Sequence, residues 1–272
     1  MNKVYTLLFI ITTFVSPAFS QSYGEVGLFV GGSTFIGDVS SSITKNTHLA
    51  VGLNYRQNFN SRWALNFAIR SAQLSGDDAN SNSNFELQRN LSFQSNAIEL
   101  ATMVEFNFFE FNPYSPQSFF QITDVFTPYI FVGISAFRFN PKAYLSGNLY
   151  ELQPFATEGV DYSRVAVAIP VGFGFKFRLS DRFILAIAGE LRITSSDYID
   201  DVSTRYPVDP SSLSKTGRDL SNKTQQNQGP NASSWGAQRG NSYNNDWFSY
   251  VGFTLTYNLK KNPGTCHFYT NK

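Results

Sequence analysis

The chain has 272 residues and a formal net charge of +1 at pH 7, a balance that excludes the strongly basic footprint of a nucleic-acid-binding protein. Its single cysteine, Cys266, excludes an internal disulfide. Beyond the first 20 residues, no apolar run reaches the roughly 18 residues that a membrane-spanning helix needs.

Residues 1–20 have the pattern of a secretory signal peptide. Lys3 supplies a short positive region, residues 4–19 are mostly apolar, and Ala18 and Ser20 place small residues at the −3 and −1 positions of a cleavage site. We therefore expect an exported chain that begins at Gln21. Its 252 residues (272 minus 20) are enough for one large β domain or two small ones.

Eight segments of the mature chain alternate bulky apolar residues with small or polar ones, which is the period of a β-strand. Residues 61–70, "SRWALNFAIR", show the pattern: odd positions from 63 are mostly bulky and even positions are small or polar. The fifth segment is nearly all apolar, so its facing stays open. The segments are residues 23–33, 48–56, 61–70, 96–108, 129–139, 164–178, 182–194 and 247–259.

The connections between these segments alternate in length. Two are short, "QNFNSR" and "RLSD", whereas the others are long and rich in Ser, Asn, Asp and Gly. Short turns at one end and long loops at the other are typical of an up-and-down antiparallel barrel. One connection, residues 109–128, should be short and yet has 20 residues. The long loops span residues 34–47, 72–95, 140–163 and 195–246, the last of which is low in apolar residues and is expected to be a flexible surface loop.

The composition of the two strand faces decides which one meets the surroundings. In a soluble two-sheet sandwich, the face opposite the bulky one should be rich in Lys, Glu and Thr, but here it is largely Gly and Ala with isolated charges. Small residues suit the crowded interior of an eight-stranded barrel. We therefore predict an all-β, transmembrane barrel of eight strands with long extracellular loops, and keep the sandwich as the alternative. Residues near strand ends that are expected at the membrane interfaces are Trp63, Tyr129, Trp247 and Tyr257.

The isolated charges on the small-residue face predict a filled, charge-paired lumen. Four acidic residues stand against five basic ones, and a lumen of eight strands has little room for a conducting pore. The predicted network comprises Glu25, Glu99, Glu105 and Glu190 with Arg56, Arg70, Arg164, Lys176 and Arg192.

The sequence offers little for catalysis. It has two histidines, His48 at the outer end of the second segment and His267 near the end of the chain, and neither belongs to an apparent Ser-His-carboxylate set or a metal-ligand spacing. "DYIDDVS", from Asp197 to Ser203, contains three carboxylates. Asp200 and Asp201 carry carboxylate oxygens, which are the ligands that Ca²⁺ prefers. The segment lacks the spacing of a calcium loop, so loop-ordering hydrogen bonds are the favoured interpretation. We expect no enzyme activity, no cofactor and no metal.

An even number of strands places both termini of the barrel on the short-turn side, in the periplasm. Residues 260–272 then form a periplasmic tail, in a compartment that permits disulfides. With no internal partner, Cys266 is either a free thiol or bonded to another protein. The tail and the 109–128 connection face the same compartment and together predict a docking surface there.

Four stretches and one late residue of the mature chain form a further pattern: "GEVGLFVGGSTFIGDV", "PYIFVGISAFRFNPKA", "IPVGFGFKF", "ELRITSSDYIDDVSTRYP" and the single Cys after the last strand. Together they resemble the PorG family of outer-membrane barrels in the type IX secretion machinery. The resemblance implies a non-enzymatic subunit that ties a periplasmic ring, made of a PorK-type lipoprotein and a PorN-type protein, to the outer membrane. It implies a part in protein export and, in gliding bacteria, in motility. It also makes Cys266 the residue expected to contact the ring, and it assigns to the family's loop motif Asp197, Tyr198, Asp200, Asp201 and Ser203.

Three function classes follow from the sequence. The first is the secretion-system anchor, which predicts stable periplasmic partners. The second is a surface-binding or adhesion barrel that acts through its extracellular loops, so that deleting residues 207–245 would abolish function. The third is a lipid-modifying barrel enzyme, which lacks an evident catalytic constellation.

Overall fold

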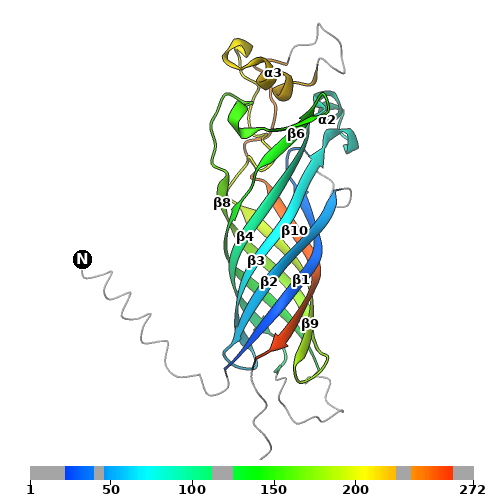
Figure 1. Cartoon of the computed structure of the whole chain (residues 1–272), viewed down its shortest axis with the longest axis vertical. Coiled ribbons are helices and arrows are strands. Elements are labelled where there is room, and N and C mark those ends of the chain that lie inside the picture. The colour runs from blue at the N-terminus through cyan, green and yellow to red at the C-terminus, as the bar shows by residue number, and fades with distance from the viewer. Residues whose placement is uncertain (1–21, 40–45, 112–124, 225–233, 260–272) are drawn as a thin grey trace, which may run out of the picture.

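The structure is a computed structural model that describes residues 22–39, 46–111, 125–224 and 234–259. In this part of the chain, eight long antiparallel strands close into a barrel, because β3 pairs with both β2 and β4 (Figure 1). The predicted fold class is confirmed. The barrel strands are β1 (Tyr23–Ile36), β2 (Thr47–Asn58), β3 (Trp63–Asp77), β4 (Ser92–Asn107), β5 (Phe126–Arg138), β8 (Val165–Arg178), β9 (Phe183–Thr194) and β10 (Trp247–Asn258).

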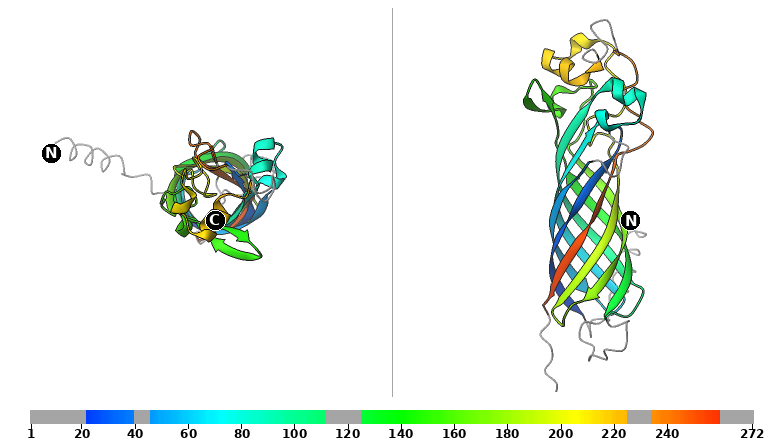
Figure 2. Two further views of the ribbon diagram at one scale, coloured as in Figure 1. Left: turned by 90° about the horizontal axis from the view of Figure 1, so that it is seen from above. Right: turned by 90° about the vertical axis from the view of Figure 1, so that its right-hand side faces the viewer.

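The remaining elements lie over the end of the barrel that carries the long connections (Figures 1 and 2). A hairpin of β6 (Pro141–Leu145) and β7 (Asn148–Glu151) extends the sheet beyond β4. We call this end, with the hairpin and the loops between the strands, the cap. Its short helical turns are η2 (Asp78–Asn80), α2 (Asn84–Arg89), η4 (Gln153–Phe155), η5 (Pro210–Ser212) and α3 (Lys215–Ser221).

Several strands are longer than the alternation predicted, since residues 72–77 and 92–95 belong to β3 and β4 and not to a loop. The pairing of these strands continues to Asp77↔Ser92. Up to Ile69 the outward residues of β3 are apolar, but from Ser71 onwards they are polar, while Leu74 and Phe93 remain buried inside. The strands therefore extend beyond the apolar zone of the wall. In that extension their sequence no longer alternates between apolar and polar residues in the way that predicts a lipid-facing strand.

The outer wall of the barrel is apolar, as a lipid-facing surface must be. Bulky side chains on every barrel strand are exposed; Leu28, for example, retains 61% of its accessible surface and Ile134 retains 73%. None of the helices in the described residues is long and apolar enough to cross a membrane. The apolar outer wall and the closed sheet, within which the backbone groups of the strands are paired, are the features of a transmembrane β-barrel.

The facing of β5, which the sequence left open, follows the same division. Phe131 and Phe137 point into the barrel, and Ile130, Val132 and Ile134 point outward. Tyr129 is 4% exposed and lies inside, so its predicted place at a membrane interface is wrong. Trp63 and Trp247 are exposed on the outer wall, in keeping with that prediction.

The glycines of β8 explain how large rings fit into so narrow a barrel. A Cβ atom at Gly172 would collide with the ring of Phe131, and one at Gly174 would crowd the ring of Tyr129. Because these positions carry no side chain, the aromatic rings of β5 fill the space over β8. The small residues of the lumen face and its bulky ones are therefore complementary parts of one packed core.

Candidate functional site

The lumen near the short-turn end holds a buried ionic cluster. Arg56 on β2 lies between two carboxylates, 2.7 Å from Glu25 on β1 and 2.9 Å from Glu105 on β4. Lys176 on β8 also donates to Glu105, at 2.7 Å, and its ammonium lies 4.5 Å from the centre of the Tyr129 ring. All four charged side chains are at most 2% exposed. The cluster therefore joins four strands by contacts that water does not screen.

A second ionic cluster lies nearer the cap. Arg70 on β3 donates to both carboxylate oxygens of Glu190 on β9, at 2.5 and 2.7 Å. Arg192 bridges Glu190 at 2.8 Å and Glu99 at 2.6 Å. The guanidinium of Arg70 also lies 4.2 Å from the centre of the Phe29 ring. Every cation of the cluster thus has a carboxylate partner within the lumen.

Arg164 was predicted to belong to the lumen network, and this prediction is wrong. It precedes β8 at the rim, is about one-third exposed, and pairs with Glu151 at 3.2 Å. The other predicted members all lie in the lumen, where four acidic residues now face four basic ones. The lumen is consequently neutral, and its members are Glu25, Glu99, Glu105, Glu190, Arg56, Arg70, Lys176 and Arg192.

The predicted loop motif from Asp197 to Ser203 lies at the centre of the cap. Asp201 accepts hydrogen bonds from Thr157 and from the hydroxyl of Tyr162, and it pairs with Arg239. Asp200 accepts from the backbone N–H groups of Val39 and Val202 at 3.0 and 2.9 Å. The motif therefore holds together connections that are far apart in the sequence. This is the loop-ordering role that the sequence favoured over a calcium site.

The other motif residues complete the same network. Asp197 accepts from the hydroxyl of Ser203 at 2.6 Å, and the backbone N–H of Ser203 donates to Glu158 at 2.9 Å. The ring of Tyr198 stacks on that of Tyr162, with centroids 4.7 Å apart.

Two buried arginines hold the cap together, and the sequence did not predict their role. Arg89, at the end of α2, pairs with Asp78 and donates to the backbone carbonyls of Asp38 and Arg239. Arg239 pairs with Glu158 at 3.1 Å. Burial disfavours the charge on Arg239, but the carboxylates of Asp201 and Glu158 outweigh burial and raise its pKa. No local pattern marks these residues, because their partners lie up to 150 positions away.

The segment predicted as a flexible surface loop therefore has a definite structure in residues 195–224 and 234–246. Its few apolar residues gave little sign of packing, but Leu213 and Leu220 are buried along with the ionic groups. The cap combines charge-assisted hydrogen bonds with a buried apolar cluster, which includes Phe139, Leu152, Ile199, Val202 and Leu220.

Burial, together with repulsion between neighbouring carboxylates, makes several carboxylic acids of the cap less acidic. Burial raises the pKa of Asp197 to about 7. Burial, together with the nearby charge of Asp38, raises the pKa of Asp200 well above its usual range, and burial together with Asp200 does the same for Asp246. Within the described residues, no three His, Cys, Asp or Glu side chains are placed to hold a metal ion.

One pair of side chains resembles part of a catalytic set. Nε2 of His48 lies 2.6 Å from Oγ of Ser75 at the outer ends of β2 and β3. No carboxylate in the described part of the chain bonds the other ring nitrogen, so the third member of a triad is missing there. Cys266, the predicted contact to a partner, lies outside the described residues.

Known proteins resemble this chain only distantly. No curated protein sequence matches the chain. Among solved structures, it is similar to the outer membrane protein OprG from Pseudomonas aeruginosa (TM-score 0.43, 9% identity, 89% of this chain and 98% of that one). It is also similar to Ail, the attachment invasion locus protein of Yersinia pestis (TM-score 0.42, 10% identity, 88% and 99%). At these identities the likeness concerns the fold alone. A family model described as a domain of unknown function, DUF6089, matches residues 2–212, and the chain therefore belongs to the DUF6089 family.

Proposed function

We propose that this chain is a non-enzymatic subunit of the type IX secretion machinery, located in the outer membrane. It would anchor a periplasmic ring of a PorK-type lipoprotein and a PorN-type protein. The observation that carries the proposal is the lumen, which is filled by a neutral, fully paired set of charged side chains. A filled lumen argues against a channel, so a partner would be bound at the outer surface, and the two ends of the barrel are the surfaces open to soluble proteins.

The short-turn end supports a role in docking. Around the described ends of the connection between β4 and β5, Phe108, Phe109 and Val125 expose apolar side chains. β10 ends at Asn258 at the same end as this connection, and residues 260–272, which include Cys266, follow it in the sequence. The resemblance of four stretches and of the late cysteine to the PorG family supplies the identity of the expected partners.

The test is a pull-down from detergent-solubilised membranes with thiols alkylated and no reductant, followed by mass spectrometry. Wild type is compared with Cys266→Ser, and with a double variant, Cys266→Ser with Ser180→Cys, that moves the only thiol to the exposed β8–β9 turn. We expect a periplasmic lipoprotein to be covalently attached to wild type alone. If it copurifies non-covalently with all three chains, the anchor stands without the disulfide. If no periplasmic protein copurifies with any of them, the anchor is refuted.

The ordered cap favours a second candidate, a surface-binding or adhesion barrel. The cap exposes Tyr243 at 95% and Val208 at 86% of their accessible surface, on a base held firmly by buried ion pairs. Replacing residues 207–245 with a short linker separates the two candidates. Loss of surface binding with intact periplasmic copurification supports adhesion, and intact function without residues 207–245 supports the anchor.

The absence of enzyme activity is tested at the His48–Ser75 pair. If the chain is non-enzymatic, Ser75→Ala leaves the lipid composition of the membrane unchanged, as judged by mass spectrometry of lipid extracts. A lipid species that accumulates only with Ser75→Ala would refute this part of the proposal.

A further inference from the structure

The hydrogen-bonded wall of the barrel is interrupted at one place between β5 and β8. The two strands pair from Phe126↔Phe177 to Val132↔Val171, and again from Ser135↔Ala168 to Arg138↔Val165. Neither Gly133 nor Ile134 has a partner on β8. The residue numbers of each pair add to the same value on both sides of the interruption, so the strands keep their register and simply part there.

The sequence explains why the strands part at this position. Pro170 would lie opposite Gly133, and it has no N–H to donate to the ladder. On the other side of β5, a Cβ atom at Gly133 would collide with the carbonyl of Thr102, so β5 lies very close to β4 there. A proline within a closed sheet conflicts with local preference, and such conflicts tend to mark functional positions.

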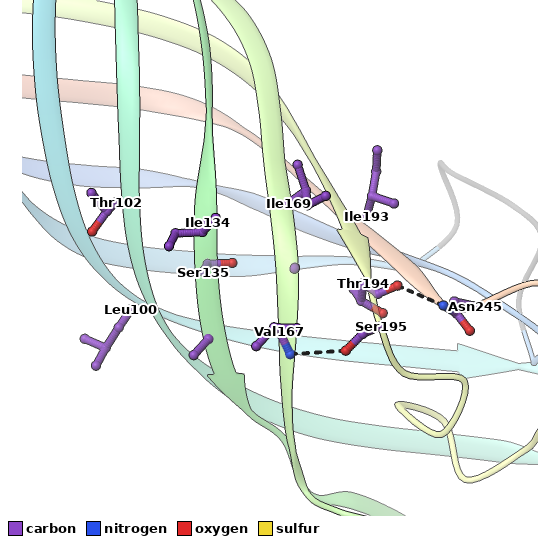
Figure 3. A pocket seen from close by; sticks show the side chains of 12 residues that line it. Leu100, Thr102, Ile134, Ser135, Val167, Ile169, Ile193, Thr194, Ser195 and Asn245 are labelled. Carbon is purple, nitrogen blue, oxygen red and sulfur yellow. Dashed lines mark hydrogen bonds between the residues drawn. The ribbon is translucent and has the colours of Figure 1, made fainter. Parts of the chain in front are cut away.

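The interruption coincides with a pocket of about 760 Å³ in the outer wall (Figure 3). Its lining combines outward residues, among them Ile134, Val167 and Ile169, with the inward residues Ser135, Ala168 and Thr194. The pocket thus enters the wall between the strands and does not merely lie on it. Its size is in the range of sites that hold a small organic molecule, and the surface on which it opens is the one that faces lipid.

Two polar groups lie where they can bind the head of a lipid. The hydroxyl of Ser135 lines the pocket, is buried, and has no hydrogen-bond partner within the described residues. Three residues further along β5, Arg138 is exposed on the outer wall, and the described part of the chain provides no carboxylate to pair with it. Three residues of strand span about 10 Å, and the long side chain of Arg138 can bring its guanidinium closer to Ser135 than that.

We propose that this pocket binds one acyl chain of a phosphate-bearing membrane lipid. The apolar residues enclose the chain, the hydroxyl of Ser135 donates to an ester carbonyl oxygen, and the guanidinium of Arg138 binds the phosphate. A guanidinium and a phosphate form charge-assisted hydrogen bonds, which are strong where water is scarce. The inference does not depend on the secretion role.

The position of the pocket identifies the leaflet that supplies the lipid. Ile134, Val167 and Ile193 lie in the halves of β5, β8 and β9 that are nearer the cap. The cap carries the long loops, which in barrels of this kind are extracellular. The occupant is therefore a lipid of the outer leaflet, and the acyl chains of a periplasmic lipoprotein would insert from the opposite leaflet.

The experiment uses the full chain in lipid nanodiscs that contain phosphatidylglycerol with a photoactivatable group on an acyl chain. After irradiation, crosslinked peptides are mapped by mass spectrometry. Ala136→Trp fills the mouth of the pocket from outside, and Ser71→Trp places the same bulk on the outer face of β3 as a matched control. We expect crosslinks concentrated on β5 and β8, reduced about tenfold by Ala136→Trp and unchanged by Ser71→Trp.

The head-group contact is tested with Arg138→Gln and with diacylglycerol that carries the same photoactivatable chain. Arg138→Gln should weaken crosslinking of phosphatidylglycerol and leave that of diacylglycerol unchanged. Crosslinks spread evenly around the barrel, with no effect of Ala136→Trp, would mean ordinary boundary lipid and would overturn the proposal. An equal effect of Arg138→Gln on both lipids would overturn the assignment of the phosphate.

Discussion

Arg70 and Glu190 join opposite walls of the barrel through two hydrogen bonds of 2.5 and 2.7 Å. In the order of strands around the barrel, β3 and β9 are four positions apart, which is the greatest separation that eight strands allow. The pair therefore braces the lumen across its width. Arg192 extends this brace to Glu99 on β4.

Replacing Arg70 by Met should destabilise the barrel strongly, because it leaves Glu190 with one cation in place of two. Breaking a buried ion pair from one side costs about 3–5 kcal/mol. The measurement is urea unfolding in detergent micelles, followed by tryptophan fluorescence. Arg164→Met is the control at the exposed rim, with an expected loss below about 1 kcal/mol. Equal losses for the two variants would contradict the assignment of Arg164 to the rim.

Two glycines that are neighbours in the sheet should respond differently to the same substitution. Gly172→Ala forces a methyl group into the ring of Phe131, an overpacking that costs roughly 1–3 kcal/mol. At Gly189 a methyl group meets nothing within 4 Å, so Gly189→Ala should be neutral or slightly stabilising. Heat-modifiable migration on gels reports the folded fraction of each. A Gly172→Ala barrel as stable as wild type would mean that Phe131 has another position.

An alternating sequence predicts which face of a strand a residue occupies, but it does not predict where the strand ends. The parity of residues 164–178 places Lys176 in the lumen, but it assigns Arg164 there too, because parity does not tell where the strand meets the rim. Beyond Ile69, the outer face of β3 becomes polar, so the apolar signal ends before the strand does. The facing of β5 depends on the glycines opposite it, which only the register of β8 reveals.

The cap was harder to predict, because its contacts join positions far apart in the chain. Asp38 accepts from the backbone N–H of Asn241, and Arg89 donates to the carbonyl of Arg239. Neither contact has a local sequence pattern. The motif around Asp201 was recognisable as a group of carboxylates, but its partners were not.

Asp201→Asn should open the cap without weakening the barrel. The variant keeps a residue that tolerates the positive φ of 69° at this position, but it removes the charge that pairs with Arg239. Hydrogen exchange should become faster in the described cap segments, by about tenfold or more, and remain unchanged in the barrel strands. Asp209→Asn, at an exposed site with local contacts to Ser211, is the control. Uniform acceleration across the barrel would mean that the cap is part of the same cooperative unit.

The cap should be more stable in acid than at neutral pH. Because the pKa of Asp197 is raised to about 7 in the folded cap, against about 4 when unfolded, its contribution is complete below pH 4. It is lost as the pH rises through 7. Asp200 and Asp246 act in the same direction.

The measurement for this prediction is amide exchange of residues 195–224 at pH 5 and pH 8, after correction for intrinsic exchange rates. Protection should fall toward pH 8, and Asp197→Asn should reduce that fall. Asp219→Asn, on the exposed side of α3, should not. Protection that rises with pH would contradict the direction of these pKa shifts.

The account depends most on the closed lumen, since the proposed anchor acts through the ends of the barrel and not through a channel. The direct measurement is the conductance of the purified full chain in a planar lipid bilayer. The neutral, paired lumen predicts no steady ionic current in wild type, and a measurable one in an Arg70→Ala and Glu190→Ala double variant that folds. A steady, ion-selective current through wild type would contradict a sealed barrel and would replace the anchor with a pore.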